Sequence, residues 1–246
     1  MNNLRIRYFF LLSAICLFAG GGYGQSVVVT AKKVTYTRPK PITDFRRAFT
    51  VIYPKIKAAT PALSKKIEAA ISYEKNFEMS IKDELNEIQW LENAAYDVGY
   101  NANGILSLSL TIEGSGAYPS DSTKYVVVDI KKGTKVKPAD AFTDLSGLLA
   151  MVSKAKDKEV AEAIAEIKKD PDNQDADIEM MFKDSEQYKK VTLDEFEIDE
   201  NGIVFHHDYG FAHVAQALQP EGDFFFSWAE LKPFIKPSGL LGRIAR

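Results

Sequence analysis

Two Asn-Gly turns, each between runs of β-type residues, constrain the fold of this 246-residue chain more than any other feature. The first covers residues 101–104 (NANG) and the second covers residues 199–202 (DENG). Asn and Gly tolerate the positive φ angles that tight hairpins demand, so each turn predicts a pair of antiparallel strands. A chain with two such hairpins must build part of its core from antiparallel sheet.

The strand predicted after the first turn has two unlike faces. Three leucines and an isoleucine occupy alternate positions from Leu106 to Ile112, and the positions between them are polar apart from Ile105. Because successive side chains of a strand point to opposite faces, we expect one apolar face and one wet face. A β-branched run at residues 125–130 adds a third strand, and the two glycines and one proline of residues 114–119 predict a bulged or irregular connection to it.

Helical periodicity appears on both sides of this meander. Apolar residues recur at intervals of three to four over residues 61–72, 77–91 and 145–167, and a further short helix is predicted over residues 175–188. Additional strands are predicted at residues 26–40, 49–56 and 223–228. The predicted fold class is therefore α+β, an antiparallel β-sheet meander with helices packed on one face.

Residues 1–24 predict a secretion signal. Two arginines precede an apolar run at residues 8–18 that is too short to span a bilayer comfortably, and small residues follow it at a cleavage site. We expect an exported chain, periplasmic or extracellular, without a transmembrane segment after cleavage. A lipoprotein anchored through the lone cysteine, Cys16, is the alternative, although Ile15 stands where a small residue is wanted.

One domain is expected after the signal. We predict an extended arm or edge strand at residues 25–44, a single α+β domain at 45–236 and a frayed tail at 237–246. The formal net charge of −3 argues against a nucleic-acid-binding surface. The acidic run at residues 170–179 lacks the order of an EF-hand loop, so we predict a solvated surface loop there.

Two stretches resemble a bacterial extracytoplasmic family of unknown function. One contains NANGILSLSL, GSGAYP and VVVDIKKGTKVKPADAF within residues 101–142; the other, FEIDENGIVFHHDYGFAHVAQALQPEGDFFFSWAELKPFI, covers residues 196–235. This family includes the sensor domain of the lysozyme-sensing anti-sigma-V factor and an accessory domain of some peptidoglycan deacetylases. The resemblance covers roughly residues 45–236. It implies the fold and, as partners, cell-wall glycan or a secreted lysozyme-like protein.

Two departures limit what the resemblance implies. The family often has a histidine after the glycine-rich loop, where this chain has Tyr118, so any role of that histidine does not carry over. Only seven residues precede the apolar run of the signal, which leaves no cytoplasmic segment to hold a sigma factor. We therefore do not expect the signalling role.

All three histidines fall between residues 206 and 213, and this cluster is the best indication of a site. His206 and His207 should point to opposite faces of a regular strand, so both could bind one zinc ion only across a bulge. We predict no metal and no cofactor. The candidate binding residues combine this cluster with the aromatic residues near it and in the glycine-rich loop: Tyr118, His206, His207, Asp208, Tyr209, Phe211 and His213.

The chain shows no recognisable nucleophile motif such as Gly-x-Ser-x-Gly. We therefore predict a secreted, non-catalytic binding module of the bacterial cell envelope that recognises cell-wall glycan or a lysozyme-like protein. A cell-envelope hydrolase, acting on glycan or ester through His206 or His207 and acids near the second hairpin, is one alternative. Glu113, Asp129, Glu195 and Asp208 are the candidate acids near strands. A structural envelope protein is the other alternative, and the sequence leaves the oligomeric state open.

Overall fold

The computed structural model describes residues 25–43, 46–169, 182 and 191–244. The predicted signal, the acidic run at residues 170–179 and, apart from Phe182, the short helix predicted over residues 175–188 lie outside the described residues.

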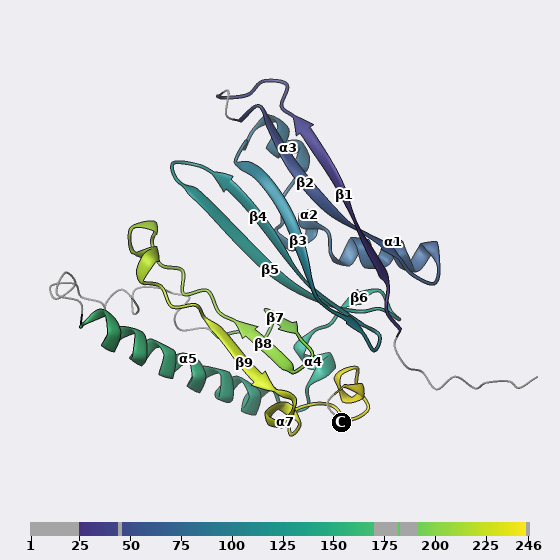
Figure 1. Cartoon of the computed structure of the whole chain (residues 1–246), viewed down its shortest axis with the longest axis vertical. Coiled ribbons are helices and arrows are strands. Elements are labelled where there is room, and N and C mark those ends of the chain that lie inside the picture. Colours follow the sequence, from purple (N-terminus) through teal and green to yellow (C-terminus); the bar gives the residue numbers. More distant parts are fainter. Residues whose placement is uncertain (1–24, 44–45, 170–181, 183–190, 245–246) are drawn as a thin grey trace, which may run out of the picture.

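A six-stranded sheet runs through the larger half of the molecule (Figure 1). Its strands lie side by side in chain order: β1 (Val28–Thr37), β2 (Ala48–Lys57), β3 (Leu91–Ala102), β4 (Ile105–Ser115), β5 (Pro119–Asp129) and β6 (Thr134–Lys135). Neighbours are antiparallel except β2 and β3, which are parallel. A parallel pair needs a crossover, and three helices fill it: α1 (Pro61–Ala70), α2 (Tyr73–Asn76) and α3 (Ile81–Asn86).

The first Asn-Gly turn forms the predicted hairpin between β3 and β4. Ala102 pairs with Ile105, and the two residues between them, Asn103 and Gly104, have φ angles of 53° and 80°. The connection predicted at residues 114–119 is irregular at residues 116–118 but contains no bulge, because β4 and β5 pair without a register shift as far as Ser115 and Pro119. The absence of a side chain at Gly114 allows close packing against Trp90, because a Cβ on Gly114 would stand 2.3 Å from the Trp90 carbonyl oxygen.

The predicted leucine face is buried beneath α1–α3 and forms a core with them. The helix predicted over residues 77–91 is shorter than expected, since α3 ends at Asn86 and β3 begins at Leu91. Glu78 and Gln89 adopt positive φ angles of 52° and 50°, and such left-handed residues cannot continue an α-helix.

The opposite face of β4 was expected to be wet, and this is wrong at its beginning. Ile105 and Ser107 are fully buried beneath a second, antiparallel sheet. This sheet consists of β7 (Phe196–Ile198), β8 (Gly202–His206) and β9 (Asp223–Ser227), and the second Asn-Gly turn joins β7 to β8. Ser107 is buried without cost to its hydroxyl because the Oγ accepts a hydrogen bond of 3.0 Å from the Ile198 N–H.

The remaining helices pack around the small sheet. After α4 (Pro138–Ala141), the long helix α5 (Leu145–Ile167) lies beyond the small sheet on its outer side (Figure 1). A helical turn, α7 (Trp228–Leu231), leads into the C-terminal segment and its short helix η5 (Leu241–Arg243). This segment is not frayed as predicted, because Leu240 and Leu241 are buried in the core.

The predicted α+β class is confirmed. The predicted second hairpin and the strand predicted at 223–228 form a separate small sheet, and the helix predicted at 145–167 lies outside that sheet, an arrangement that the prediction of one sheet did not contain. No helix among the described residues is long and apolar enough to span a bilayer.

Candidate functional site

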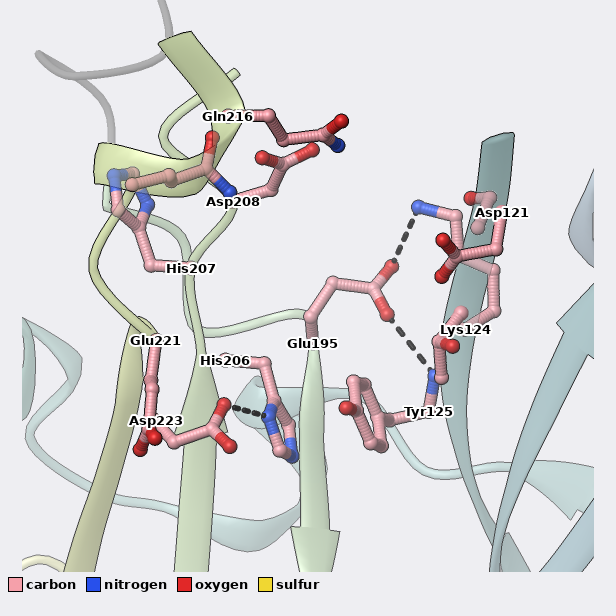
Figure 2. A pocket seen from close by; sticks show the side chains of 13 residues that line it. Asp121, Lys124, Tyr125, Glu195, His206, His207, Asp208, Gln216, Glu221 and Asp223 are labelled. Atoms are coloured by element: carbon pink, nitrogen blue, oxygen red, sulfur yellow. Dashed lines mark hydrogen bonds and ion pairs between the residues drawn. The ribbon is translucent and has the colours of Figure 1, made fainter. Parts of the chain in front are cut away.

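A groove of 340 Å³ opens where the second hairpin and the segment after it face the outer half of β5 (Figure 2). Residues 121–125 of β5 line one side. The other side comprises Glu195 before β7, residues 206–208 at the end of β8, and residues 216–223, which include the end of the 3₁₀ helix η4 (His213–Leu218). The groove therefore lies between the two sheets.

Glu195 joins the two sides of the groove. Among the described residues, β5 pairs with β6 only at Val128 and Asp129, so its outer edge at Tyr125 has no neighbouring strand there. The Oε2 of Glu195 accepts a hydrogen bond of 3.2 Å from the Tyr125 N–H, and its Oε1 lies 3.2 Å from Lys124 Nζ (Figure 2). The Glu195 carboxylate thus provides a hydrogen-bond acceptor for a backbone N–H at the open edge of β5 and forms an ion pair with the neighbouring lysine.

His206 lies at the base of the groove, with its side chain only 9% exposed. It pairs with Asp223 across β8 and β9, and its Nδ1 is 2.7 Å from Asp223 Oδ1. The ring stacks on Tyr125 with centroids 3.4 Å apart, and its Nε2 lies 3.6 Å from Glu197 Oε1. Two carboxylates of the small sheet and one aromatic ring of the large sheet therefore contact the imidazole.

The carboxylates control the protonation of this cluster. Burial lowers the pKa of His206, but the hydrogen bond to Asp223 and the charge of Glu197 outweigh burial, so the pKa lies above its ordinary value. Burial, reinforced by the charges of Asp223, Glu197 and Glu195, raises the pKa of Tyr125 to about 12. Tyr125 is therefore a neutral phenol, and a protonated His206 is favoured between its two carboxylates.

The groove is strongly acidic. Five carboxylates line it: Asp121, Glu195, Asp208, Glu221 and Asp223. Its single lysine, Lys124, already pairs with Glu195. Such an excess of one charge in a hollow attracts ligands of the opposite charge, and carboxylates form their strongest hydrogen bonds with ammonium and guanidinium groups. The arrangement therefore suits a cationic ligand.

The predicted site residues divide between the groove and the packing behind it. His206, His207 and Asp208 line the groove. His207 has its ring edge against Tyr209 at 4.8 Å, and burial and nearby Lys156 lower its pKa. Tyr209 is fully buried and donates a 2.6 Å hydrogen bond to Glu159 of α5.

Like Tyr209, the other three predicted residues lie outside the groove lining. Phe211 packs on Phe182, with ring centroids 4.9 Å apart, and so belongs to the packing behind the groove. Tyr118 stacks on His213 at 4.4 Å, and this contact joins the tip of the β4–β5 hairpin to η4. These two elements carry opposite sides of the groove, so the stacked pair fixes their separation.

Sequence reasoning missed Asp121, Tyr125 and Asp223. Asp121 and Tyr125 are four residues apart on β5 and therefore share a face, but the predicted strand began only at Tyr125. Asp223 lies opposite His206 because of the register of β8 and β9, which the sequence alone does not specify. Within the described part of the chain, no three His, Cys, Asp or Glu residues are grouped so as to hold a metal ion.

We expect His206 and His207 to titrate on opposite sides of the ordinary value of 6.5. The contribution of His206 to stability is complete below the unfolded pKa and is lost as the pH rises through its raised folded pKa. That of His207 is complete above the unfolded pKa and is lost as the pH falls through its lowered folded pKa. NMR titration of the imidazole protons measures both values.

An Asp223→Asn variant separates the causes of these shifts. Loss of the carboxylate should lower the pKa of His206 and leave that of His207 unchanged, because Asp223 contacts only the former. Asp97→Asn, on the exposed surface of β3, is the control and should change neither. Two histidines that titrate together in the unmodified protein would contradict the described environment.

The fold is that of two solved structures of DUF3298 family proteins. The first, from Bacteroides fragilis NCTC 9343, superposes with a TM-score of 0.58 and 13% identity, over 90% of this chain and 98% of the other. The second, from Pseudomonas aeruginosa PAO1, gives a TM-score of 0.52 and 13% identity, over 86% and 94% of the two chains. This family includes the anti-sigma-factor sensor and deacetylase accessory domains that the sequence resembles, so the resemblance is confirmed as one of fold. The sequence matches no protein-family model and no curated protein.

Proposed function

We propose that the chain is an exported, non-catalytic binding module of the bacterial cell envelope whose acidic groove recognises a basic secreted protein of the lysozyme kind. The observation that carries the proposal is the charge of the groove, where five carboxylates face two cationic groups, Lys124 and His206, that are both already paired. A neutral, N-acetylated wall glycan would not need this excess of negative charge. Lysine and arginine side chains of a basic protein would.

The geometry supports recognition by a preformed surface. Glu195, His206 and Asp223 are held by hydrogen bonds before any ligand arrives. A site with fixed side chains loses little conformational entropy when it binds. Asp121 and Glu221 make no side-chain hydrogen bond or ion pair within the described residues, so their carboxylates are available to a partner.

A triple variant, Asp121→Asn/Asp208→Asn/Glu221→Gln, tests the proposal. It removes three charges from the groove and leaves Glu195 and the His206–Asp223 pair intact. We expect the association rate constant for lysozyme, measured by surface plasmon resonance at low ionic strength, to fall by about tenfold, because long-range attraction mainly accelerates encounter. Added salt should reduce the difference between variant and unmodified protein.

The matched control, Glu87→Gln/Glu92→Gln/Asp97→Asn, removes the same charge from exposed positions outside the groove. We expect less than about a twofold change for it. Equal effects of the two triple variants, or the absence of saturable lysozyme binding, would reject the proposal. Binding to insoluble peptidoglycan in place of lysozyme, lost in the groove variant alone, would move the ligand to the wall glycan.

One observation favours a second candidate, the cell-envelope hydrolase. The 2.7 Å hydrogen bond between His206 and Asp223 has the form of a histidine oriented by an acid, as in hydrolytic sites. The hydroxyls of Ser122 and Thr123 also line the groove. Hydrolysis of a model ester or of peptidoglycan by the purified protein, abolished by His206→Gln, would establish this function and overturn the non-catalytic one.

A further inference from the structure

A second cavity, of 380 Å³, lies toward the opposite end of β5 from the acidic groove. The turn between β5 and β6, the start of α4 and residues 238–243 of the C-terminal segment line it. Four basic side chains surround this cavity: Lys131, Lys132, Lys135 and Arg243. Such a gathering is notable in a chain whose net charge is negative. It shares no residue with the acidic groove.

The two carboxylates of this cavity are already engaged within the protein. Asp129 is buried, and its Oδ1 accepts hydrogen bonds from the N–H groups of Lys131 (2.9 Å) and Lys132 (3.2 Å). Its Oδ2 lies 3.6 Å from Lys132 Nζ. The Oδ2 of Asp140 accepts the Lys137 N–H at 3.2 Å and so caps α4. Neither carboxylate serves the other three cations.

Those three cations, Lys131, Lys135 and Arg243, make no side-chain hydrogen bond or ion pair within the described part of the chain. Lys135 is half-buried, where an ammonium group loses part of its hydration and gains most from a counter-charge. Three like charges around one hollow also repel each other. An anion in the cavity would satisfy all three.

The backbone segments that carry these side chains are closely packed. Gly133 has a φ of 70° and lies so close to α1 that a Cβ would stand 2.8 Å from Lys66 Cβ. The guanidinium of Arg243 covers the β3–β4 turn, where a Cβ on Gly104 would stand 3.1 Å from Nη1. Buried Leu241 fixes the segment that carries Arg243. The cationic side chains therefore extend from backbone segments that are packed against the rest of the fold.

We propose that this basic cavity binds the phosphate group of a phosphate ester. The planar guanidinium of Arg243 can donate two hydrogen bonds to one phosphate, and the two lysines supply point charges. The exposed Ser238 hydroxyl, which also lines the cavity, is a further donor. The phosphate can belong to a small soluble ester or to the headgroup of an anionic lipid, and the experiment separates these sources.

Titration of the ¹⁵N-labelled exported chain with inorganic phosphate tests the proposal. We expect saturable shifts of the amides at residues 131–135 and 238–243, and a loss of affinity of at least about tenfold in a Lys131→Gln/Lys135→Gln/Arg243→Gln variant. The matched control is Lys32→Gln/Lys33→Gln/Lys57→Gln, which removes the same charge from the exposed surface of β1 and β2. It should keep phosphate affinity within about twofold.

Co-sedimentation with vesicles identifies the source of the phosphate. Binding to phosphatidylglycerol vesicles but not to phosphatidylcholine vesicles, lost in the cavity variant, assigns a lipid headgroup. Phosphate binding without vesicle binding assigns a soluble ester. Unsaturable shifts, shifts spread over the whole surface, or equal losses in the two triple variants would overturn the proposal. None of these results depends on lysozyme binding to the acidic groove.

Discussion

An Arg38→Met variant should lose about 3–5 kcal/mol of stability, the usual cost of removing one member of a buried ion pair. The side chain is fully buried and lies 3.5 Å from Glu84 Oε2. It donates hydrogen bonds of 2.7–2.9 Å to the carbonyl oxygens of Glu84, Leu91 and Arg46, and its guanidinium covers the Phe49 ring at 4.6 Å. Methionine would fill the volume but leave these acceptors unpaired.

Urea unfolding measures this change as a lower midpoint at an unchanged m value. Lys33→Met is the control, because Lys33 is an exposed residue of β1, the strand that directly precedes Arg38. Its replacement should cost no more than about 0.5 kcal/mol of stability. The double variant Arg38→Met/Glu84→Gln should cost less than the sum of the two single changes, since the residues share one network. A loss below about 1 kcal/mol for Arg38→Met would show that the guanidinium is not needed to join β1 to β3.

Truncation of Phe205 should have a similarly large effect on the smaller half of the molecule. Phe205 is fully buried between the small sheet and its neighbours, with ring centroids 6.1 Å from Phe142, 6.0 Å from Phe196 and 6.2 Å from Phe226. Replacing a buried phenylalanine with alanine leaves a cavity and typically costs about 3–5 kcal/mol. We expect this loss in Phe205→Ala by the same urea measurement.

Phe225→Ala is a matched control for this change. Phe225 lies on neighbouring β9 but faces the other side of the sheet, where 49% of it is exposed. Its truncation should cost about 1 kcal/mol or less. Because Phe205 directly precedes His206, the large loss in Phe205→Ala should also reduce lysozyme binding at temperatures near its unfolding midpoint. Equal losses of stability in the two variants would contradict the assignment of the two faces of the small sheet.

The three-stranded meander of the large sheet could be predicted because its signals are local, whereas the parallel pairing of β2 with β3 could not. The Asn-Gly turn fixed the β3–β4 hairpin, and the alternation from Leu106 to Ile112 identified the face that α1–α3 cover. The other face was misjudged because burial of Ser107 depends on a hydrogen bond from Ile198, which is 91 residues away in the sequence. The alternation of apolar and polar residues shows which face of a strand is polar. It does not show that a distant backbone group will form a hydrogen bond with a polar side chain and allow it to be buried.

The candidate site was only partly predictable for the same reason. The histidine cluster drew attention to the hairpin that borders the groove, but the partners of His206, Tyr125 and Asp223, come from β5 and β9. Arg38 was missed altogether, because it follows β1 in a segment expected to be an extended arm or edge strand, and its acceptors lie on other segments. The charges of the groove come from segments that are distant in the sequence, and hydrophobic periodicity does not show which distant segments will be neighbours.

The central claim, that the acidic groove is a recognition surface for a basic protein, is tested most directly by mapping the contact. Unlabelled lysozyme would be added to the ¹⁵N-labelled chain from residue 25 onward while its amide signals are followed. We predict saturable changes concentrated at Asp121–Tyr125, at residues 206–208 and at the four residues of segment 216–223 that line the groove, Gln216, Gln219, Glu221 and Asp223. Changes confined to the β1 edge or the outer face of α5, or no changes at all, would contradict the claim.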